Sequence, residues 1–242
     1  PIGGIALSIS QRPVRLSFRE LGLTLDVPCT STHWEKAMRK LTVAAFMSLD
    51  GVMQAPGGPE EDTSDGFLYG GWIVPYADNV SGQAIQDLFA KPFELLLGRR
   101  TYDIFAAYWP YREADSNSHA IADLFNSVPK HVATHHPDSL DWHNSHALQG
   151  NLVDAIRALK HERGADLLTQ GSGDLVRQLL AAGLVDELRL MIFPVVLGRG
   201  KRLFDDTAQA LAFTLAHSVS TPGGVLIARY VSQGEVRTGT FE

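Results

Sequence analysis

The sequence has almost no cysteine: Cys29 is the only one among 242 residues. A single thiol excludes an internal disulfide framework and a cysteine-rich zinc site, and it is typical of proteins of the reducing cytoplasm. Apolar runs are short, and none approaches the roughly 18 residues of a membrane-spanning helix. The segment at 3–10 is too short for a signal peptide and has no basic residues before it. We therefore expect a cytoplasmic protein that is not bound to a membrane.

Positive charge is also scarce, because 21 Lys and Arg face 27 Asp and Glu, for a net charge of −6. This balance argues against broad nucleic-acid binding but leaves room for a local basic pocket. The 45% of hydrophobic and 20% of charged residues are typical of a soluble globular protein. The length permits one large domain or two small ones.

Residues 1–37 show no sustained hydrophobic period, whereas Met38-Arg39-Lys40 precedes a strong strand pattern, as a natural start would. We predict that 1–37 is a flexible, dispensable N-terminal extension. A single α/β domain is expected over 38–234 and a short tail over 235–242.

Hydrophobic periodicity predicts strands that alternate with helices. Strands are expected at 41–47, 93–97, 129–134 and 186–193, and helices at 81–90, 99–107, 118–127 and 151–163. A strand, a glycine turn and a helix are expected over 166–182, with Gly164 and Gly183 as C-terminal helix caps. Strands at 211–217 and 225–231 flank a turn at 221–224. The order predicts a mostly parallel mixed sheet with helices on both faces and an antiparallel C-terminal hairpin.

One strand-to-helix junction combines an apolar run at 95–97 with Gly98, Arg99, Arg100 and Thr101. Gly98 permits a tight turn, and the helix that follows exposes unpaired N–H groups and a partial positive charge. Such an end favours an anion. The arginines could instead be solvated charges, although cations at a helix N-terminus oppose the helix dipole.

A second junction of this kind ends in Gly171, Ser172 and Gly173 and leads into a helix that opens with Asp174. A lone Gly-Ser-Gly is more often a plain turn than a phosphate site. Two such junctions in one domain, one of them with arginines, can hold a ligand with several phosphates. We therefore predict a dinucleotide site.

Three further features are candidates for substrate contacts. Asp50 before Gly51 is either an ordinary turn former or the acid that orients or protonates a substrate. The Gly/Pro/acid-rich loop at 52–65 has a length that indicates a functional or disordered segment. The aromatic residues within 66–75, including Trp72, suit a pocket wall or a core.

Several histidines between residues 131 and 146 suggest a metal site. Only His131 and His135 have the spacing of a helical ligand pair, and they straddle the end of a predicted strand. We therefore expect solvated loop histidines and no metal.

From Met38 onward the chain resembles the dihydrofolate-reductase-like superfamily. It is most similar to the reductase domain of bifunctional riboflavin-biosynthesis enzymes, the RibD C-terminal domain, and to its single-domain relatives. The resemblance rests on five motifs in order: Ser-Leu-Asp-Gly at 48–51, Leu-Gly-Arg-Arg-Thr-Tyr at 97–102, Gly-Ser-Gly at 171–173, Gly-Leu-Val-Asp-Glu-Leu at 183–188 and Pro-Val-Val-Leu-Gly-Arg-Gly-Lys at 194–201. Together they are specific for the superfamily and much less specific for the substrate.

The resemblance implies a dihydrofolate reductase-like three-layer fold and NADPH as the hydride donor. Arg99, Arg100 and Thr101 would hold the 2′-phosphate and diphosphate, since a guanidinium fork suits a phosphate. Thr134 and His135 would lie around the adenosine phosphate. The remaining implied contacts are Gly98, Gly171, Ser172, Gly173 and Asp174 with the diphosphate, Ala45 and Val52 beside the nicotinamide, and Asp50 and Trp72 with the substrate.

The sequence departs from its relatives in two places. A true dihydrofolate reductase carries an acid in the helix that lines the pterin pocket, and Asp78, the nearest candidate, is out of step. Asp50 instead matches the acid of the riboflavin-type reductases. With one cysteine, the sequence also lacks the His-x-Glu and Pro-Cys-x-x-Cys signature of the zinc deaminase that accompanies the riboflavin enzyme.

The resemblance thus implies a monofunctional NADPH-dependent reductase of a small heterocyclic or ribosylamino-pyrimidine substrate, and a homodimer. One alternative is a dihydrofolate reductase. Another is a module that binds NADPH with little turnover.

Overall fold

The structure, a computed structural model, describes residues 38–112 and 119–241. The predicted extension at 1–37 lies outside the described residues. The predicted domain and the tail fall within them, apart from 113–118 and residue 242.

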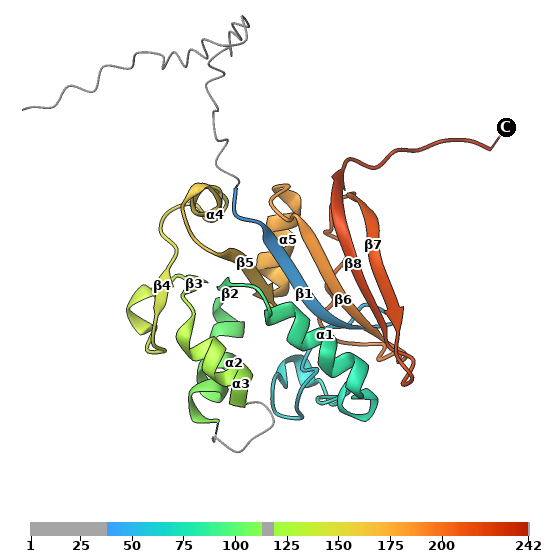
Figure 1. Ribbon diagram of the computed structural model, residues 1–242, viewed down its shortest axis with the longest axis horizontal. Coiled ribbons are helices and arrows are strands. Elements are labelled where there is room, and N and C mark those ends of the chain that lie inside the picture. The colour runs from blue at the N-terminus through green and yellow to red at the C-terminus, as the bar shows by residue number, and fades with distance from the viewer. Residues whose placement is uncertain (1–37, 113–118, 242) are drawn as a thin grey trace, which may run out of the picture. The chain divides into compact units, whose positions relative to one another are not determined.

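Within the described ranges, eight strands form one sheet in the order β4-β3-β2-β5-β1-β6-β8-β7 (Figure 1). Strands β1 to β6 run parallel to their neighbours, and β8 and β7 are antiparallel additions next to β6. The strands are β1 Leu41–Ser48, β2 Phe93–Gly98, β3 Lys130–Ala133, β4 Ser145–Ala147, β5 Asp166–Gln170, β6 Glu187–Phe193, β7 Ala212–Ser220 and β8 Leu226–Gly234. The predicted mixed sheet with an antiparallel C-terminal hairpin is confirmed.

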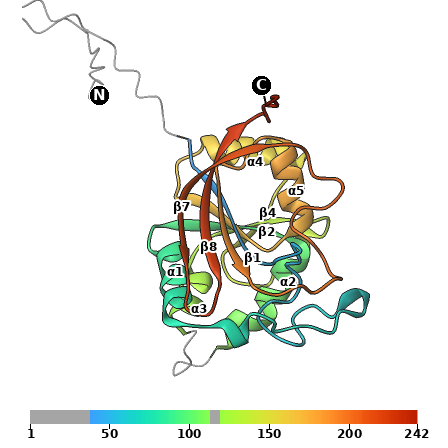
Figure 2. The ribbon, with the colours of Figure 1, turned by 90° about the vertical axis from the view of Figure 1, so that its right-hand side faces the viewer.

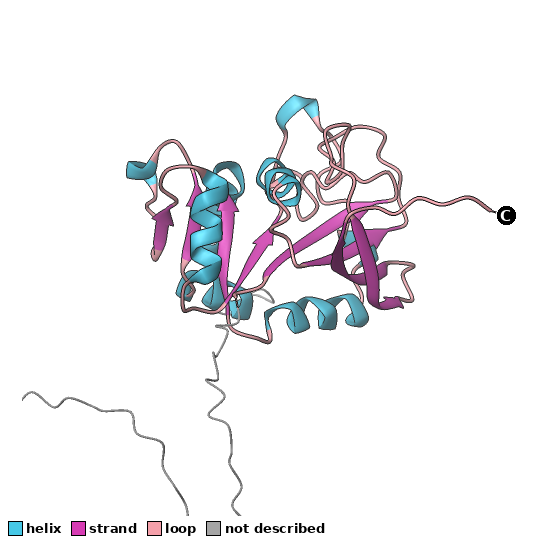
Figure 3. Cartoon of the chain, turned by 90° about the horizontal axis from the view of Figure 1, so that it is seen from above, coloured by secondary structure: helices cyan, strands magenta, loops and turns pink. Residues whose placement is uncertain are grey.

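Helices cover both faces of the sheet, as Figure 3 shows from above. The α-helices are α1 Asn79–Phe89, α2 Arg99–Tyr108, α3 His119–Ser127, α4 Leu152–His161 and α5 Gly173–Ala181. Short 3₁₀ turns lie at Ser64–Gly66, Val74–Tyr76, Trp109–Tyr111 and Pro137–Ser139. Figure 2 shows the β7–β8 hairpin in front, with α5 to its right.

The central strand β2 is buried on both faces, as its uninterrupted apolar run at 95–97 predicts. In β2, Leu95 and Leu97 pack with the side chains of α1, α2 and α3, whereas Leu96 packs on the opposite face with those of α4 and α5. All three leucines have no exposed surface. The alternation of strand side chains thus divides the core into two layers of helix packing.

A third apolar cluster includes Met191 and Phe193 at the carboxyl end of β6. The rings of Trp72 and Phe193 meet edge to face at 5.4 Å between centroids. Because Val52 and Phe67 belong to the same cluster, the loop after β1 packs against the body of the domain over part of its length.

Side-chain caps and glycines set the ends of several helices. Asn151 caps α4 by accepting hydrogen bonds from the amides of Val153 and Asp154. Gly183 has a φ of 64° just after α5, in agreement with its predicted capping role. Gly164 does not cap α4, because the helix ends at His161. A Cβ at Gly164 would lie 2.8 Å from both Arg39 and Glu94, so close packing explains the glycine.

Candidate functional site

The two predicted junctions lie next to each other because β2 and β5 are paired strands. The Gly98 amide donates a hydrogen bond of 2.9 Å to the Ser172 hydroxyl. In return, the Ser172 amide donates to the Thr101 hydroxyl at 3.0 Å. We call this pair of hydrogen bonds the junction lock. It holds the N-termini of α2 and α5 side by side at the carboxyl ends of parallel strands, where open α/β sheets bind ligands.

Ser172 has a left-handed backbone with φ 54° and ψ 49°, which is unusual for a residue with a side chain. Its hydroxyl does not cap α5 and instead accepts the hydrogen bond from Gly98. Gly171 before it has a φ of 76°, and a Cβ there would contact Thr101 at 3.4 Å. Strained residues persist where surrounding contacts hold them, and they cluster at functional sites.

Arg99 connects the start of α2 with the segment that follows β3. Its Nη1 donates to the hydroxyl of Ser139 at 2.6 Å and to that of Thr134 at 3.4 Å. Its Nε is paired with Asp103 at 2.8 Å. The structure thus brings the two candidate phosphate contacts Arg99 and Thr134 together, and His135, the residue after Thr134, is exposed.

Arg100 points to a different partner, the acid-rich loop after β1. Its Nη2 lies 2.6 Å from Oδ1 of Asp62, and Nζ of Lys201 lies 2.7 Å from Oδ2 of the same carboxylate. The Ser64 hydroxyl also donates to Oδ1 at 2.6 Å. This part of the predicted functional-or-disordered loop is therefore ordered and charged.

Gln54, a buried side chain, anchors this loop from both of its ends. Its Nε2 donates to the carbonyls of Asp62 and Ser64 at 3.1 and 3.0 Å, and its Oε1 accepts from the Lys201 amide at 3.0 Å. The exposed fraction of Gln54 is 4%. The loop after β1 and the segment around Lys201 thus share one hydrogen-bonded support.

Asp50 holds the segment after β6. Its carboxylate accepts hydrogen bonds from the Ser48 hydroxyl at 2.6 Å and from the amides of Leu197 and Gly198 at 3.1 and 2.8 Å. Arg202 adds an ion pair at 3.4 Å. Burial alone would raise the pKa of Asp50, but the hydrogen bonds outweigh it and lower the pKa to about 2. Asp50 is therefore ionised at neutral pH. An ionised carboxylate with these contacts is better suited to hold the segment after β6 in position than to donate a proton to a substrate. The catalytic role of Asp50 stays a prediction.

Other predicted contact residues lie below the surface. Ala45 is 5% exposed and Val52 is fully buried, so their side chains belong to the core. Trp72 is 7% exposed, and its indole N–H donates to the Gln54 carbonyl at 2.8 Å. Trp72 thus supports the loop from inside, and its contact with a substrate stays a prediction. Asp174 is exposed and pairs with Arg177 one turn further along α5.

Asp78 acts as a helix cap. Its carboxylate accepts from the Ser81 amide at 2.8 Å, the reciprocal bond of a capping box is present, and the Gly223 amide donates to it at 3.3 Å. The hydrogen bond from the Ser81 amide is the main cause that lowers the pKa of Asp78 to about 2. The carboxylate of Asp78 is therefore engaged as a helix cap, in agreement with the expectation that Asp78 is a poor match for the acid of a pterin pocket.

His131 and His146 lie opposite each other on the paired strands β3 and β4, with ring centroids 6.4 Å apart. His131 pairs with Glu94 at 2.7 Å near the opposite end of β2. Over 38–112 and 119–241, no three His, Cys, Asp or Glu side chains are grouped so that they could hold a metal ion. In the same ranges, no helix has both the length and the apolar character to span a membrane.

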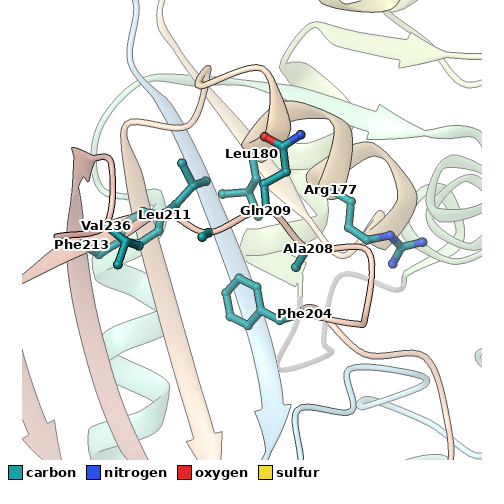
Figure 4. A pocket seen from close by; sticks show the side chains of 9 residues that line it. Arg177, Leu180, Phe204, Ala208, Gln209, Leu211, Phe213 and Val236 are labelled. Atoms are coloured by element: carbon teal, nitrogen blue, oxygen red, sulfur yellow. The ribbon is translucent and has the colours of Figure 1, made fainter. Parts of the chain in front are cut away.

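A cavity of about 310 Å³ lies between α5, the segment before β7 and the tail (Figure 4). Its lining is mostly apolar and includes Leu180, Phe204, Leu211, Phe213 and Val236, with Arg177 at one side. None of the predicted site residues lines it.

No sequence motif singles out Asp62, Gln54 or Ser139, and Lys201 appears only as the last residue of the motif at 194–201. Asp62 lies in the long loop that was predicted to be functional or disordered, but its partners are 38 and 139 residues away. Ser139 follows Pro137 in a short 3₁₀ turn that local patterns do not distinguish from other turns.

The chain matches known proteins over most of its length. A model of the RibD C-terminal domain family matches residues 39–227. The uncharacterized Bacillus subtilis (strain 168) protein YyaP is 28% identical over 169 residues, which are 68% of this chain and 87% of that protein.

Two solved structures show the same fold at low sequence identity. A candidate riboflavin biosynthesis protein from Shewanella sp. PV-4 is 20% identical with a TM-score of 0.53, covering 80% of this chain and 99% of that one. Dihydrofolate reductase from Enterococcus faecalis, complexed with NADP(H) and RAB-propyl, is 14% identical with a TM-score of 0.51 over 80% of this chain and 96% of that one. The fold is therefore dihydrofolate reductase-like, and the chain belongs to the RibD C-terminal domain family.

Proposed function

We propose that this protein is an NADPH-dependent reductase that transfers a hydride to a small heterocyclic or ribosylamino-pyrimidine substrate. The observation that carries the proposal is the junction lock, which places two anion-binding helix ends side by side. Membership of the RibD C-terminal domain family supports the class of reaction.

The side chains around the lock fit NADPH by the chemistry of their donors. The first turns of α2 and α5 would hold the diphosphate. Arg99, with the hydroxyls of Thr134 and Ser139, would hold the 2′-phosphate. The Enterococcus faecalis dihydrofolate reductase, which has the same fold, is complexed with NADP(H). When bound, NADPH would supply the hydride.

The chain itself would contribute mainly orientation. Asp50 holds the segment at 197–202 through its hydrogen bonds. The ion pairs of Asp62 with Arg100 and Lys201 hold the loop after β1. Both segments therefore keep a defined position at the carboxyl end of β1. Holding the reactants in near-attack geometry accounts for much of the catalysis expected here. Because Asp50 is ionised, a water molecule oriented by polar groups is the better source of the substrate's proton.

A riboflavin-type substrate fits better than dihydrofolate. Asp78 is bound to the start of α1 as its cap. Asp87, the acid within α1, is exposed and accepts a hydrogen bond from Gln83 at 2.9 Å. Both carboxylates therefore already have hydrogen-bond partners in α1, which supports the riboflavin-type substrate over dihydrofolate.

We also propose a homodimer through β7. In the described sheet β7 is the outer strand and pairs with β8. Its Leu215 and Val219 side chains are 51% and 39% exposed, which is typical of a surface that another chain covers. Light scattering of the purified protein tests this, and a monomer at all concentrations would refute it.

Calorimetric titration with NADPH and NADH, followed by NADPH-oxidation assays, tests the function. Dihydrofolate and the phosphoribosylamino-pyrimidinone intermediate of riboflavin biosynthesis are the discriminating substrates. We expect NADPH to bind and to be oxidised with the pyrimidine substrate. Binding without oxidation of any carbonyl or imine substrate would indicate a binding module, and no binding would overturn the proposal.

A further inference from the structure

The carboxylate of Asp62 lies between two cations from distant parts of the chain. Arg100 in the first turn of α2 takes one oxygen at 2.6 Å, and Lys201 takes the other at 2.7 Å. The Asp62 side chain is 8% exposed, but those of Arg100 and Lys201 are 59% and 39% exposed. The cations are therefore open to solvent on the side that the carboxylate does not cover.

The donors around Asp62 form a set that also suits a phosphate group. The two carboxylate oxygens of Asp62 accept hydrogen bonds from the Arg100 guanidinium, the Lys201 ammonium and the Ser64 hydroxyl. The Ser64 hydroxyl in turn accepts a hydrogen bond from Lys201 at 2.7 Å. Phosphate groups are bound in proteins by the same combination of charged and hydroxyl donors. Because Arg100 lies two residues after Gly98, this set is close in sequence to the junction lock.

The segment at 55–65, which carries Asp62, keeps its conformation through tertiary contacts and not through the backbone preferences of its own residues. Ala55 and Asp65, at its two ends, have left-handed φ angles of 45° and 57°. For residues with a side chain, such a conformation costs about 1 to 2 kcal/mol each. The segment keeps this conformation through Gln54 and through the ion pairs of Asp62, so a loss of those ion pairs allows it to shift.

We propose that Arg100, Lys201 and Ser64 form a phosphate-binding site and that Asp62 is its internal competitor. In this structure the carboxylate occupies the position that a phosphate group of a bound ligand would take. The proposal rests on the proposed function only for the identity of the natural ligand, a phosphorylated nucleotide. The site itself is defined by the contacts of Asp62.

Competition of this kind lowers the apparent affinity, because a ligand binds only the fraction of molecules in which the carboxylate has moved away. The competition by Asp62 also persists over a wide pH range, because the carboxylate stays ionised. Burial would raise the pKa of Asp62, but hydrogen bonds from Lys201 and Ser64 outweigh it and lower the pKa to about 2. Asp62 is thus charged wherever the folded protein is studied near neutrality.

The test is a calorimetric titration of the full chain with inorganic pyrophosphate and, separately, with NADPH. Asp62→Asn keeps the size of the side chain and removes its charge. We expect Asp62→Asn to bind pyrophosphate about 5- to 50-fold more tightly than the wild type, the usual range for a coupling between two binding events. Unchanged or weaker binding would overturn the proposal.

Asp65→Asn is the matched control, because it removes the same charge from the same loop at an exposed residue whose left-handed backbone suits Asn. It should leave pyrophosphate affinity within about twofold, since no direct contact is lost. An equal gain in both variants would show a general charge effect and would also overturn the proposal.

Arg100→Ala provides a second measurement in case Asp62→Asn is poorly folded, which a melting curve will reveal. Arg100→Ala should weaken pyrophosphate binding about tenfold, and the double variant should lose the gain of Asp62→Asn. Unchanged binding by Arg100→Ala would exclude a phosphate site. Because these results use pyrophosphate, they stand even if NADPH does not bind, in which case the proposed function alone fails.

Discussion

The amide of Gly98 donates a hydrogen bond of 2.9 Å to the hydroxyl of Ser172, although the two residues lie 74 positions apart. This bond and the return bond from Ser172 to Thr101 use two of the N–H groups at the helix junctions. The amides that remain for a ligand are therefore those of the first turns themselves, at 99–101 in α2 and 173–175 in α5. The lock determines how far apart these two sets of donors lie.

Ser172→Ala should weaken NADPH binding about fivefold or more and lower the melting temperature, because the Gly98 amide loses its acceptor at a cost of about 1 to 3 kcal/mol. Ser172→Gly should weaken binding similarly but destabilise the fold less, since glycine adopts the φ of 54° without strain. Calorimetry and thermal unfolding of both variants measure these effects. Wild-type affinity in both variants would mean that the lock does not position the donors.

Arg99→Ala should reduce NADPH affinity about 10- to 100-fold, the equivalent of about 1.5 to 3 kcal/mol for a charge-assisted contact. NADH lacks the 2′-phosphate, so its affinity should change little. Arg157→Ala is the control, because this exposed arginine of α4 forms a local ion pair with Asp154 at 3.2 Å and is not among the candidate site residues. Equal losses for both cofactors would contradict the assignment of Arg99 to the 2′-phosphate.

Asp50→Asn should destabilise the fold by about 1 to 3 kcal/mol at neutral pH, because an amide cannot accept all the hydrogen bonds that the carboxylate accepts. The folded pKa of about 2 lies below the ordinary aspartate pKa of 3.8, so this stabilisation is present above about pH 4. It is lost as the pH falls from about 4 toward 2. Denaturant unfolding of both proteins across this range measures the difference. If Asp50 were instead the proton donor, the activity of the wild type would depend on its protonated form and would fall as the pH rises above the pKa of Asp50.

Gly200→Ala should destabilise the protein by about 2 to 5 kcal/mol, through strain at a positive φ and through overpacking. Gly200 has a φ of 125°, and a Cβ there would lie 2.7 Å from Val52 and 2.9 Å from Phe67. Gly82→Ala in α1 meets nothing within 4 Å and should stabilise the protein by about 0.5 to 1 kcal/mol. Urea unfolding of the two variants measures both effects. Equal stabilities would contradict the close packing described at Gly200.

The buried side chain of Lys130 should make the folded protein more stable at alkaline pH. It is fully buried on β3, and its Nζ donates to the carbonyls of Val128 and His143 at 2.8 and 2.9 Å. Burial lowers its pKa from 10.5 to about 8, so the folded protein releases this proton before the unfolded chain does. The free energy of unfolding should therefore rise between pH 8 and 10.5, by an amount on the order of 3 kcal/mol.

Chemical unfolding of the wild type and of Lys130→Met at several pH values isolates this contribution. The difference in stability between them should change in favour of the wild type as the pH rises. A difference that stays constant from pH 7 to 10 would show that Lys130 does not titrate in this range.

Most of the fold could be predicted because its signals are local. The apolar run of β2 and the glycine that ends it are consecutive residues, and the helix that follows has an uninterrupted amphipathic period. β4 was missed, because Ser145–Ala147 has no apolar run and is defined by its pairing with β3. Gly164 was misread for a related reason, since contacts with Arg39 and Glu94, distant in the sequence, account for it.

The site was predictable where a motif is contiguous and unpredictable where it depends on distant contacts. Gly98, Arg99 and Ser172 could be named from two strand-to-helix junctions. The pairing of Arg100 with Asp62 could not be named, because both residues have several possible partners and only the folded chain selects one. The carboxylate of Asp50 could be singled out from its Ser-Leu-Asp-Gly turn, but its bonds to the amides of Leu197 and Gly198 are known only from the structure.

The place of β5 in the sheet has a consequence for how the protein is made. β5 pairs with β1 on one side and β2 on the other, so in the described sheet it joins the β4-β3-β2 half to the β1-β6-β8-β7 half. During synthesis, β1 and β2 leave the ribosome long before residues 166–170 exist. The edges of β1 and β2 that pair with β5 therefore stay unpaired until β5 emerges, and unpaired strand edges of this kind favour aggregation of a nascent chain.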